Sequence, residues 1–169
     1  QIILGYGAYK KDKSFLNRLI RYETLLTALQ YFSYAKIGIP YMGVGRNLAY
    51  TKSSFFSVNG FVDHMHIRSG DDDLFINQAA NKTNTAICYQ PDAMTTSTPK
   101  STFKEWLLQK RRHISTAKYY KNTHKLLLGL YYLSQILFWL LAIAVSALAI
   151  DPQIVLPLIG IRFLIFYLI

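Results

Sequence analysis

The sequence predicts an α/β domain followed by transmembrane α-helices, and the distribution of its apolar residues is the main reason. Hydrophobic side chains make up 51% of the 169 residues. From Gln1 to Lys125 they are interspersed with nearly all of the charges, as in a folded domain. Leu126 to Ile150, in contrast, contains no charged residue and no histidine. At 1.5 Å rise per residue, a helix of this length can cross a hydrocarbon core of about 30 Å.

Helical spacing and turn residues organise the first fifty residues. A short apolar opening ends in a predicted turn at Gly5-Tyr6-Gly7. Apolar residues at i, i+3 and i+4 then predict a helix over Ser14 to Ala35, which Gly38-Ile39-Pro40 ends because proline cannot continue the helical hydrogen bonds. Tyr41 to Tyr50 is predicted to be extended, and its two glycines, Gly43 and Gly45, would allow a close approach to the backbone.

Three more elements are expected before residue 100. Ser53 to Phe61 predicts a short helix or turn, and Ser69 to Leu74 opens a helix whose first turn carries carboxylates, which suit the helix dipole. Thr85 to Tyr89 predicts a strand. Residues 91–99, rich in Pro, Ser and Thr, are predicted to be a loop.

A helix at residues 102–113 is predicted to lie at the membrane surface. It begins with a capping box, Thr102-x-x-Glu105. Trp106, Gln109 and His113 follow at i, i+3 and i+7, so they share one face.

The net charge of +10 indicates an anionic partner. The basic residues gather just before the apolar run, where Lys and Arg mark the cytoplasmic flank of a spanning helix and meet lipid headgroups. We therefore expect membrane lipids rather than nucleic acid as the partner, and assign Lys110 and Arg111 to the headgroups. The single Cys88 excludes an internal disulfide and fits a reducing cytoplasm. The basic residues are Lys100, Lys104, Lys110, Arg111, Arg112, Lys118, Lys121 and Lys125.

These observations predict a domain at residues 1–121, a transmembrane helix at 122–150 and the start of a second membrane helix at 154–169. Asp151-Pro152 is expected to break the chain between the two helices. The predicted location is a cytoplasmic (inner) membrane, multi-pass, with the domain facing the cytoplasm. The ends at Gln1 and Ile169 lead us to expect a fragment of a longer protein.

Three motifs occur in a fixed order along the chain. The first is Gly43-Val44-Gly45-Arg46-Asn47-Leu48-Ala49-Tyr50, and the second is Gly70-Asp71-Asp72-Asp73-Leu74. The third, Gln109-Lys110-Arg111-Arg112-His113, directly precedes the apolar run. Together they resemble membrane-anchored family 2 glycosyltransferases of the GT-A type, from the helix at Ser14 to the end of the first membrane helix.

The resemblance implies site residues for sugar transfer. Asp72 would be the catalytic base, with Asp71 tuning it and Asp73 capping the helix. Gln109, Arg112 and His113 would bind the donor diphosphate and the acceptor end, although this family usually has Trp where His113 stands. Gly45, Arg46 and Asn47 would contribute to the same binding. A solvated helix start without catalytic function remains an alternative for the three acids.

The implied function is an inverting transfer of a sugar from a nucleotide-sugar donor to a lipid-linked or polysaccharide acceptor. A divalent cation, Mg²⁺ or Mn²⁺, is expected as cofactor, with its ligands upstream of Gln1 and none in this chain. The fragment alone is therefore expected to be inactive. The alternative function is a non-catalytic membrane adaptor that binds lipids or a partner through its basic segment.

Overall fold

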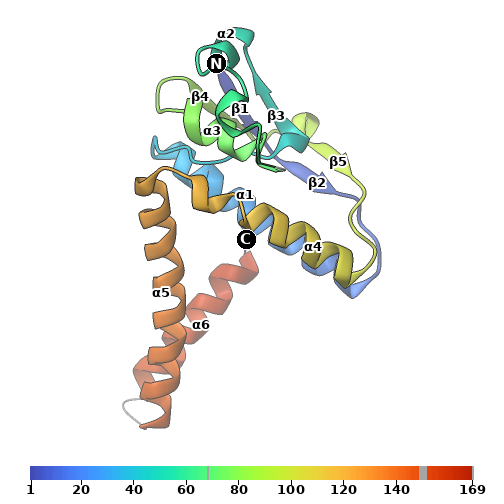
Figure 1. Ribbon diagram of the computed structural model, residues 1–169. Coiled ribbons are helices and arrows are strands. Elements are labelled where there is room, and N and C mark those ends of the chain that lie inside the picture. Colours follow the sequence, from blue (N-terminus) through green and yellow to red (C-terminus); the bar gives the residue numbers. More distant parts are fainter. Residues whose placement is uncertain (68, 149–151, 169) are drawn as a thin grey trace. The chain divides into compact units, whose positions relative to one another are not determined.

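The computed structural model describes residues 1–67, 69–148 and 152–168, which form two compact units (Figure 1). The first, Gln1–His124, mixes helices with two small β-sheets. The second, Lys125–Ile169, is described over two helices. The molecule is therefore a mixed α/β domain with a helical unit after it.

Two small sheets share the amino-terminal residues. β1 (Ile2–Gly5) is the middle strand of one sheet, antiparallel to β3 (Leu48–Tyr50) and parallel to β4 (Thr85–Cys88). β2 (Gly7–Tyr9) pairs in parallel with β5 (Thr95–Ser97) in the other sheet. The chain thus passes from one sheet to the next with a single residue between them.

The predicted turn at Gly5-Tyr6-Gly7 is wrong, because this segment is extended and hydrogen-bonded on both sides of Tyr6. The Asn47 side chain donates through Nδ2 to the carbonyl oxygens of Tyr6 (3.0 Å) and Ala93 (2.8 Å). The glycines make room for neighbouring side chains. A Cβ on Gly5 would lie 2.5 Å from Asn47 Cγ, and one on Gly7 would lie 2.9 Å from Arg46 Cβ.

Helix α1 (Phe15–Lys36) begins where the sequence predicts. The Ser14 side chain caps it by accepting from the Asn17 backbone N–H (3.1 Å). Its buried face includes Ile20, Ala28 and Tyr31, and the Tyr31 hydroxyl donates to the Gly5 carbonyl oxygen (2.7 Å). This bond ties the helix to the point where β1 ends.

Short helices carry the chain between the strands, and α3 lies in the core with Phe75 and Ile76 fully buried. The segment at residues 91–99, predicted to be a loop, contains a 3₁₀ turn and strand β5. The segment from Tyr41 to Tyr50, predicted to be extended, contains a 3₁₀ turn before strand β3. The elements are η1 (Gly45–Asn47), α2 (Lys52–Phe56), η2 (Val62–His64), α3 (Asp73–Ala79), η3 (Pro91–Ala93), α4 (Phe103–Ile114) and η4 (Ala117–Tyr119).

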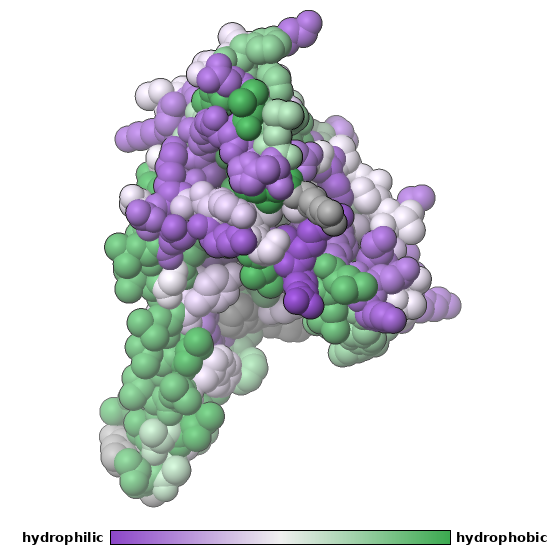
Figure 2. Space-filling model, viewed as in Figure 1, coloured by the Kyte–Doolittle hydropathy of each residue, from purple (hydrophilic) through white to green (hydrophobic). Residues whose placement is uncertain are grey.

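Helix α5 (Asn122–Ala147) is long and apolar enough to cross a membrane, judged by its length and composition. It covers most of the predicted 122–150 span, and its apolar side chains are exposed (Figure 2). Helix α6 (Pro152–Leu168) is shorter and contains Pro157. The predicted break at Asp151 lies outside the described residues.

A polar contact joins the two helices of the second unit. The Arg162 guanidinium donates to Gln135 Oε1, and its Cζ lies 4.1 Å from the centre of the Phe138 ring. An arginine in such an apolar helix needs partners of this kind.

Candidate functional site

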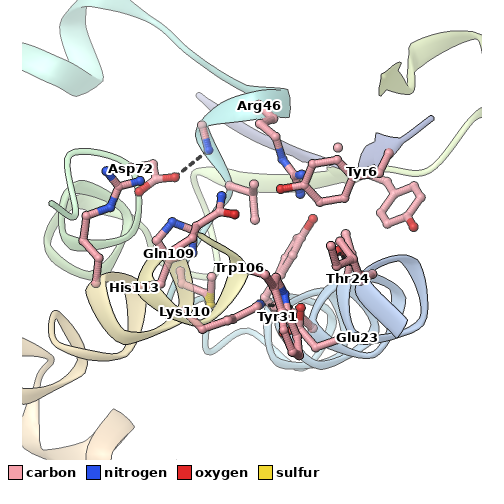
Figure 3. A pocket seen from close by; sticks show the side chains of 18 residues that line it. Tyr6, Glu23, Thr24, Tyr31, Arg46, Asp72, Trp106, Gln109, Lys110 and His113 are labelled. Carbon is pink, nitrogen blue, oxygen red and sulfur yellow. Dashed lines mark hydrogen bonds and ion pairs between the residues drawn. The ribbon is translucent and has the colours of Figure 1, made fainter. Parts of the chain in front are cut away.

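The first unit contains a pocket of about 320 Å³ that brings the three sequence motifs together. It lies between α1, the segment around η1, the start of α3 and one face of α4 (Figure 3). Six of the eight residues predicted from the sequence line it: Gly45, Arg46, Asp72, Gln109, Arg112 and His113. The other two, Asp71 and Asn47, lie outside its lining.

Asp72 is held in a fixed orientation at the start of α3. Its Oδ2 accepts from the backbone N–H of Gly45 (2.7 Å), which is the dashed bond in Figure 3. Its Oδ1 accepts from the backbone N–H of Asp73 (2.9 Å), so Asp72 caps the helix. Each carboxylate oxygen keeps a second lone-pair direction, and the half-buried side chain lines the pocket. Asp72 can therefore still accept a hydrogen bond from a bound molecule.

The neighbouring acids differ from Asp72 in burial and partners. Asp71 is exposed. Asp73 is only 7% exposed, and its Oδ2 accepts from the hydroxyls of Thr116 (2.6 Å) and Tyr120 (2.5 Å). Burial raises the pKa of Asp73, and these two hydrogen bonds oppose the increase. The expectation that Asp73 caps the helix is corrected, because Asp72 is the cap and Asp73 anchors the segment after α4.

Helix α4 presents its predicted face to the pocket. Thr102 caps it as predicted, with Oγ1 accepting from the Glu105 N–H (3.3 Å), and the Glu105 carboxylate accepts from the Thr102 hydroxyl (3.1 Å). Trp106, Gln109 and His113 all line the pocket, as their spacing predicts. Partial desolvation, and then the charge of Lys110, lower the pKa of His113. The neutral imidazole is therefore favoured at pH 7.

The structure places Lys110 differently from our expectation. We assigned it to lipid headgroups, but it lines the pocket and forms an ion pair with Glu23 on α1. The other carboxylate oxygen of Glu23 accepts from the Thr27 hydroxyl (3.0 Å). The pair joins α1 to α4 across one wall of the pocket.

Tyrosines and a guanidinium form the pocket end that lies away from Asp72 (Figure 3). The Cζ of Arg46 lies 4.0 Å from the centre of the Tyr9 ring. Desolvation raises the pKa of Tyr6, and the positive charges of Arg21 and Arg46 oppose the increase. Asn47, predicted to bind a ligand, instead holds the backbone at Tyr6 and Ala93.

Several lining residues are absent from the sequence prediction. Tyr6, Thr24 and Tyr31 belong to no motif, and the packing of α1 against β2 and β4 brings them to the site. Trp106 did carry a signal, since it shares a helix face with Gln109 and His113. Glu23 also belongs to no motif, and it pairs with Lys110.

A divalent cation is not assigned to this site. Within residues 1–67, 69–148 and 152–168, the structure shows no group of three or more His, Cys, Asp or Glu side chains arranged to hold a metal ion.

The chain was compared with protein-family models, with curated proteins and with solved structures. None of the three comparisons found a match.

Proposed function

We propose that the chain is the carboxy-terminal part of a GT-A domain of a membrane-anchored, inverting family 2 glycosyltransferase. The observation that supports this best is the convergence of Asp72, Gly45-Arg46 and the Gln109-to-His113 face on one pocket. These segments are far apart in the sequence, and the resemblance requires all of them at one active site. A solvated helix start with no function would not require that convergence.

The chemistry follows from the orientation of these side chains. An acceptor hydroxyl attacks the anomeric carbon of the donor, the bond from that carbon to the diphosphate oxygen breaks, and the hydroxyl proton passes to Asp72. The attack takes place opposite the leaving group, so the anomeric centre inverts. Arg112 presents a planar fork to the departing diphosphate, and Gln109 can donate beside it.

The expected cation would add positive charge at the diphosphate. We propose that its ligands belong to the nucleotide-binding part of the enzyme, outside this chain.

Helix α5 supports a membrane location for this reaction. We propose a multi-pass protein of the cytoplasmic membrane, with α6 as part of its second membrane helix and the first unit in the cytoplasm. The basic residues before the apolar run would contact anionic lipid headgroups. The acceptor would be a lipid-linked or growing glycan at that surface.

A non-catalytic membrane adaptor is the second candidate, supported by the exposed basic residues before α5. The two functions differ in what they require of Asp72. An adaptor would bind through its basic segment whether residue 72 is acidic or not.

The test is transfer of radiolabelled sugar to membrane acceptors by the protein expressed from its whole reading frame. Asp72→Asn keeps the shape but is a poor proton acceptor, so kcat should fall by about 10²-fold or more with little change in donor binding. The matched control is Asp71→Asn, an exposed acid outside the pocket, which should retain near-normal turnover. Full turnover by Asp72→Asn would exclude its role as the base, and no transfer by the unmodified protein would favour the adaptor.

A further inference from the structure

One end of the pocket carries hydrogen-bond donors without partners. Tyr6, Tyr31 and Trp106 supply aromatic surface there, with Arg46 nearby (Figure 3), and the Tyr9 ring lies against the Arg46 guanidinium. Arg46 Nη1 and Trp106 Nε1 are both buried, and neither has a hydrogen-bond partner in the described part of the chain. Buried donors without partners are costly, so their presence at a pocket wall indicates a bound group that accepts from them.

The charge of Arg46 narrows the chemistry of that group. The guanidinium lies over the Tyr9 ring, and the described residues place no carboxylate within 4.0 Å of it. Both acids of the pocket are engaged elsewhere. Glu23 is paired with Lys110, and Asp72 accepts from two backbone N–H groups. The positive charge at this end is therefore not neutralised by the protein around it.

The remaining surface suits a sugar ring. The pocket volume of about 320 Å³ is at the lower end of the range for small-molecule sites. Aromatic rings offer an apolar face to the C–H groups of a sugar. The hydroxyls of Thr24 and Thr27 on α1 donate to the Ile20 carbonyl oxygen and to Glu23, so they can act toward a sugar hydroxyl only as acceptors. A neutral sugar would satisfy the Trp106 donor but would leave the Arg46 charge uncompensated.

We propose that the pocket end lined by Tyr6, Arg46 and Trp106 binds an anionic saccharide, one that carries a carboxylate or a phosphate, as the acceptor. The role of this saccharide as the acceptor rests on the proposed function, whereas the binding of an anionic saccharide is inferred from the pocket residues alone. This site is separate in role from Arg112, which serves the donor diphosphate. Recognition of an anionic group would select acceptors before any transfer takes place.

Ligand binding in the absence of donor tests this proposal. The sequence contains two tryptophans, so Trp139→Phe leaves Trp106 as the fluorescent reporter in the pocket. The chain in detergent is titrated with glucuronate, glucose 6-phosphate and glucose at constant ionic strength. Both anionic sugars, or one of them, should bind at least about tenfold more tightly than glucose, because a charge-assisted hydrogen bond is stronger than a neutral one. The two anions together distinguish a carboxylate from a phosphate requirement.

Three variants locate the anion. R46Q should weaken anion binding by about tenfold or more, and R46K, which keeps the charge but not the fork, should bind with intermediate affinity. The matched control K104Q removes one positive charge from the same helix as Trp106, outside the pocket, and should bind like the parent. Loss of binding in R112Q but not in R46Q would overturn the proposal, because the anion would then lie at the donor clamp.

Binding measurements on the parent protein test the proposal even if R46Q does not fold. Equal binding of glucose and the anionic sugars, or no binding of any of them, overturns the proposal. Because no donor and no turnover are involved, these outcomes leave the Asp72 transfer test unaffected. The two proposals can therefore fail independently.

Discussion

Asp72 and Asp73 are adjacent in the sequence but have opposite surroundings. Asp72 is half-buried at the pocket and accepts from two backbone N–H groups. Asp73 points into the protein and holds two hydroxyls of the segment that follows α4. One turn of chain at the start of α3 thus provides both a carboxylate at the pocket and an anchor for the segment that follows α4.

Arg112→Ala should impair transfer through the leaving group. Removing the guanidinium takes away a fixed positive charge for the diphosphate, and kcat/KM should fall by an amount equivalent to about 2–4 kcal/mol. Steady-state kinetics of radiolabelled transfer measures this. Arg111→Ala is the matched control, since Arg111 is exposed and lies outside the pocket lining. Equal loss in both variants would indicate a general charge effect rather than a clamp.

The sequence predicts the polar residues of this site better than its apolar ones. Asp72, Gln109, Arg112 and His113 belong to short motifs, so their presence in one pocket follows from recognising those motifs. Tyr6 and Tyr31 have no such local signal. They reach the pocket because Tyr6 lies between two strands and because Tyr31 is tied to Gly5, and both contacts depend on tertiary packing.

At the scale of elements, α4 is held to the rest of the first unit by a few polar contacts. Its own residues are half-buried or exposed. The Lys110–Glu23 ion pair joins it to α1, and Thr116, just beyond its end, donates to Asp73 and also contacts the His113 carbonyl oxygen (2.6 Å). The positions of Gln109 and Arg112 at the pocket therefore depend on contacts made by other residues, namely the Lys110–Glu23 pair and Thr116.

The Lys110–Glu23 pair should contribute modestly to stability. The two side chains are 28% and 32% exposed, between a surface pair and a buried one, so we expect a coupling energy of about 0.5–1 kcal/mol. A double-mutant cycle with Lys110→Ala and Glu23→Ala, followed by denaturant unfolding of the first unit, measures it. A coupling energy indistinguishable from zero would remove the pair as a tie between the helices.

Asp73 should make stability depend on pH in a defined direction. Its folded pKa is raised above the ordinary value of 3.8, so the folded state holds this proton more tightly than the unfolded state does. Its stabilising contribution is complete below pH 3.8 and is lost as the pH rises through the folded pKa. Asp73→Asn, which stays neutral, should lose less stability than the parent as the pH rises from 4 to 8.

Thermal unfolding followed by circular dichroism measures this difference across the pH series. Asp71→Asn is the control, because that exposed acid has no such anchor. If the parent and Asp73→Asn changed in parallel with pH, the buried carboxyl would not be the group responsible. Asp73→Ala should be less stable than Asp73→Asn at every pH, since Thr116 and Tyr120 would lose their acceptor.

The longer elements follow from periodicity and caps, whereas the three-residue ones do not. Helix α1 was predicted from helical spacing, α4 from a capping box, and α5 from a long apolar run without charges. Strand β5 (Thr95–Ser97) has no pattern of its own in a Pro-, Ser- and Thr-rich stretch. It exists because β2 offers a parallel partner and because Thr95 donates to the Arg46 carbonyl oxygen (2.6 Å).

For the whole molecule, the orientation of α5 is the main testable feature. The basic residues before the apolar run should keep the first unit in the cytoplasm. In a Cys88→Ser background, a cysteine at Lys118 should be protected from a membrane-impermeant reagent in sealed cells, and one at Gln153 should be labelled. Labelling of the Lys118 position from outside would reverse the assignment.

β1 and β2 each pair with a strand that is synthesised much later, and this sets an order for folding during synthesis. β1 needs β4, which ends at Cys88, and β2 needs β5, which ends at Ser97, so neither sheet can be completed early. α4 and then α5 leave the ribosome shortly after these strands. If α5 spans a membrane, as proposed, closure of the sheets competes in time with insertion of α5, and a delay in translation downstream of Ser97 would allow the sheets to form first.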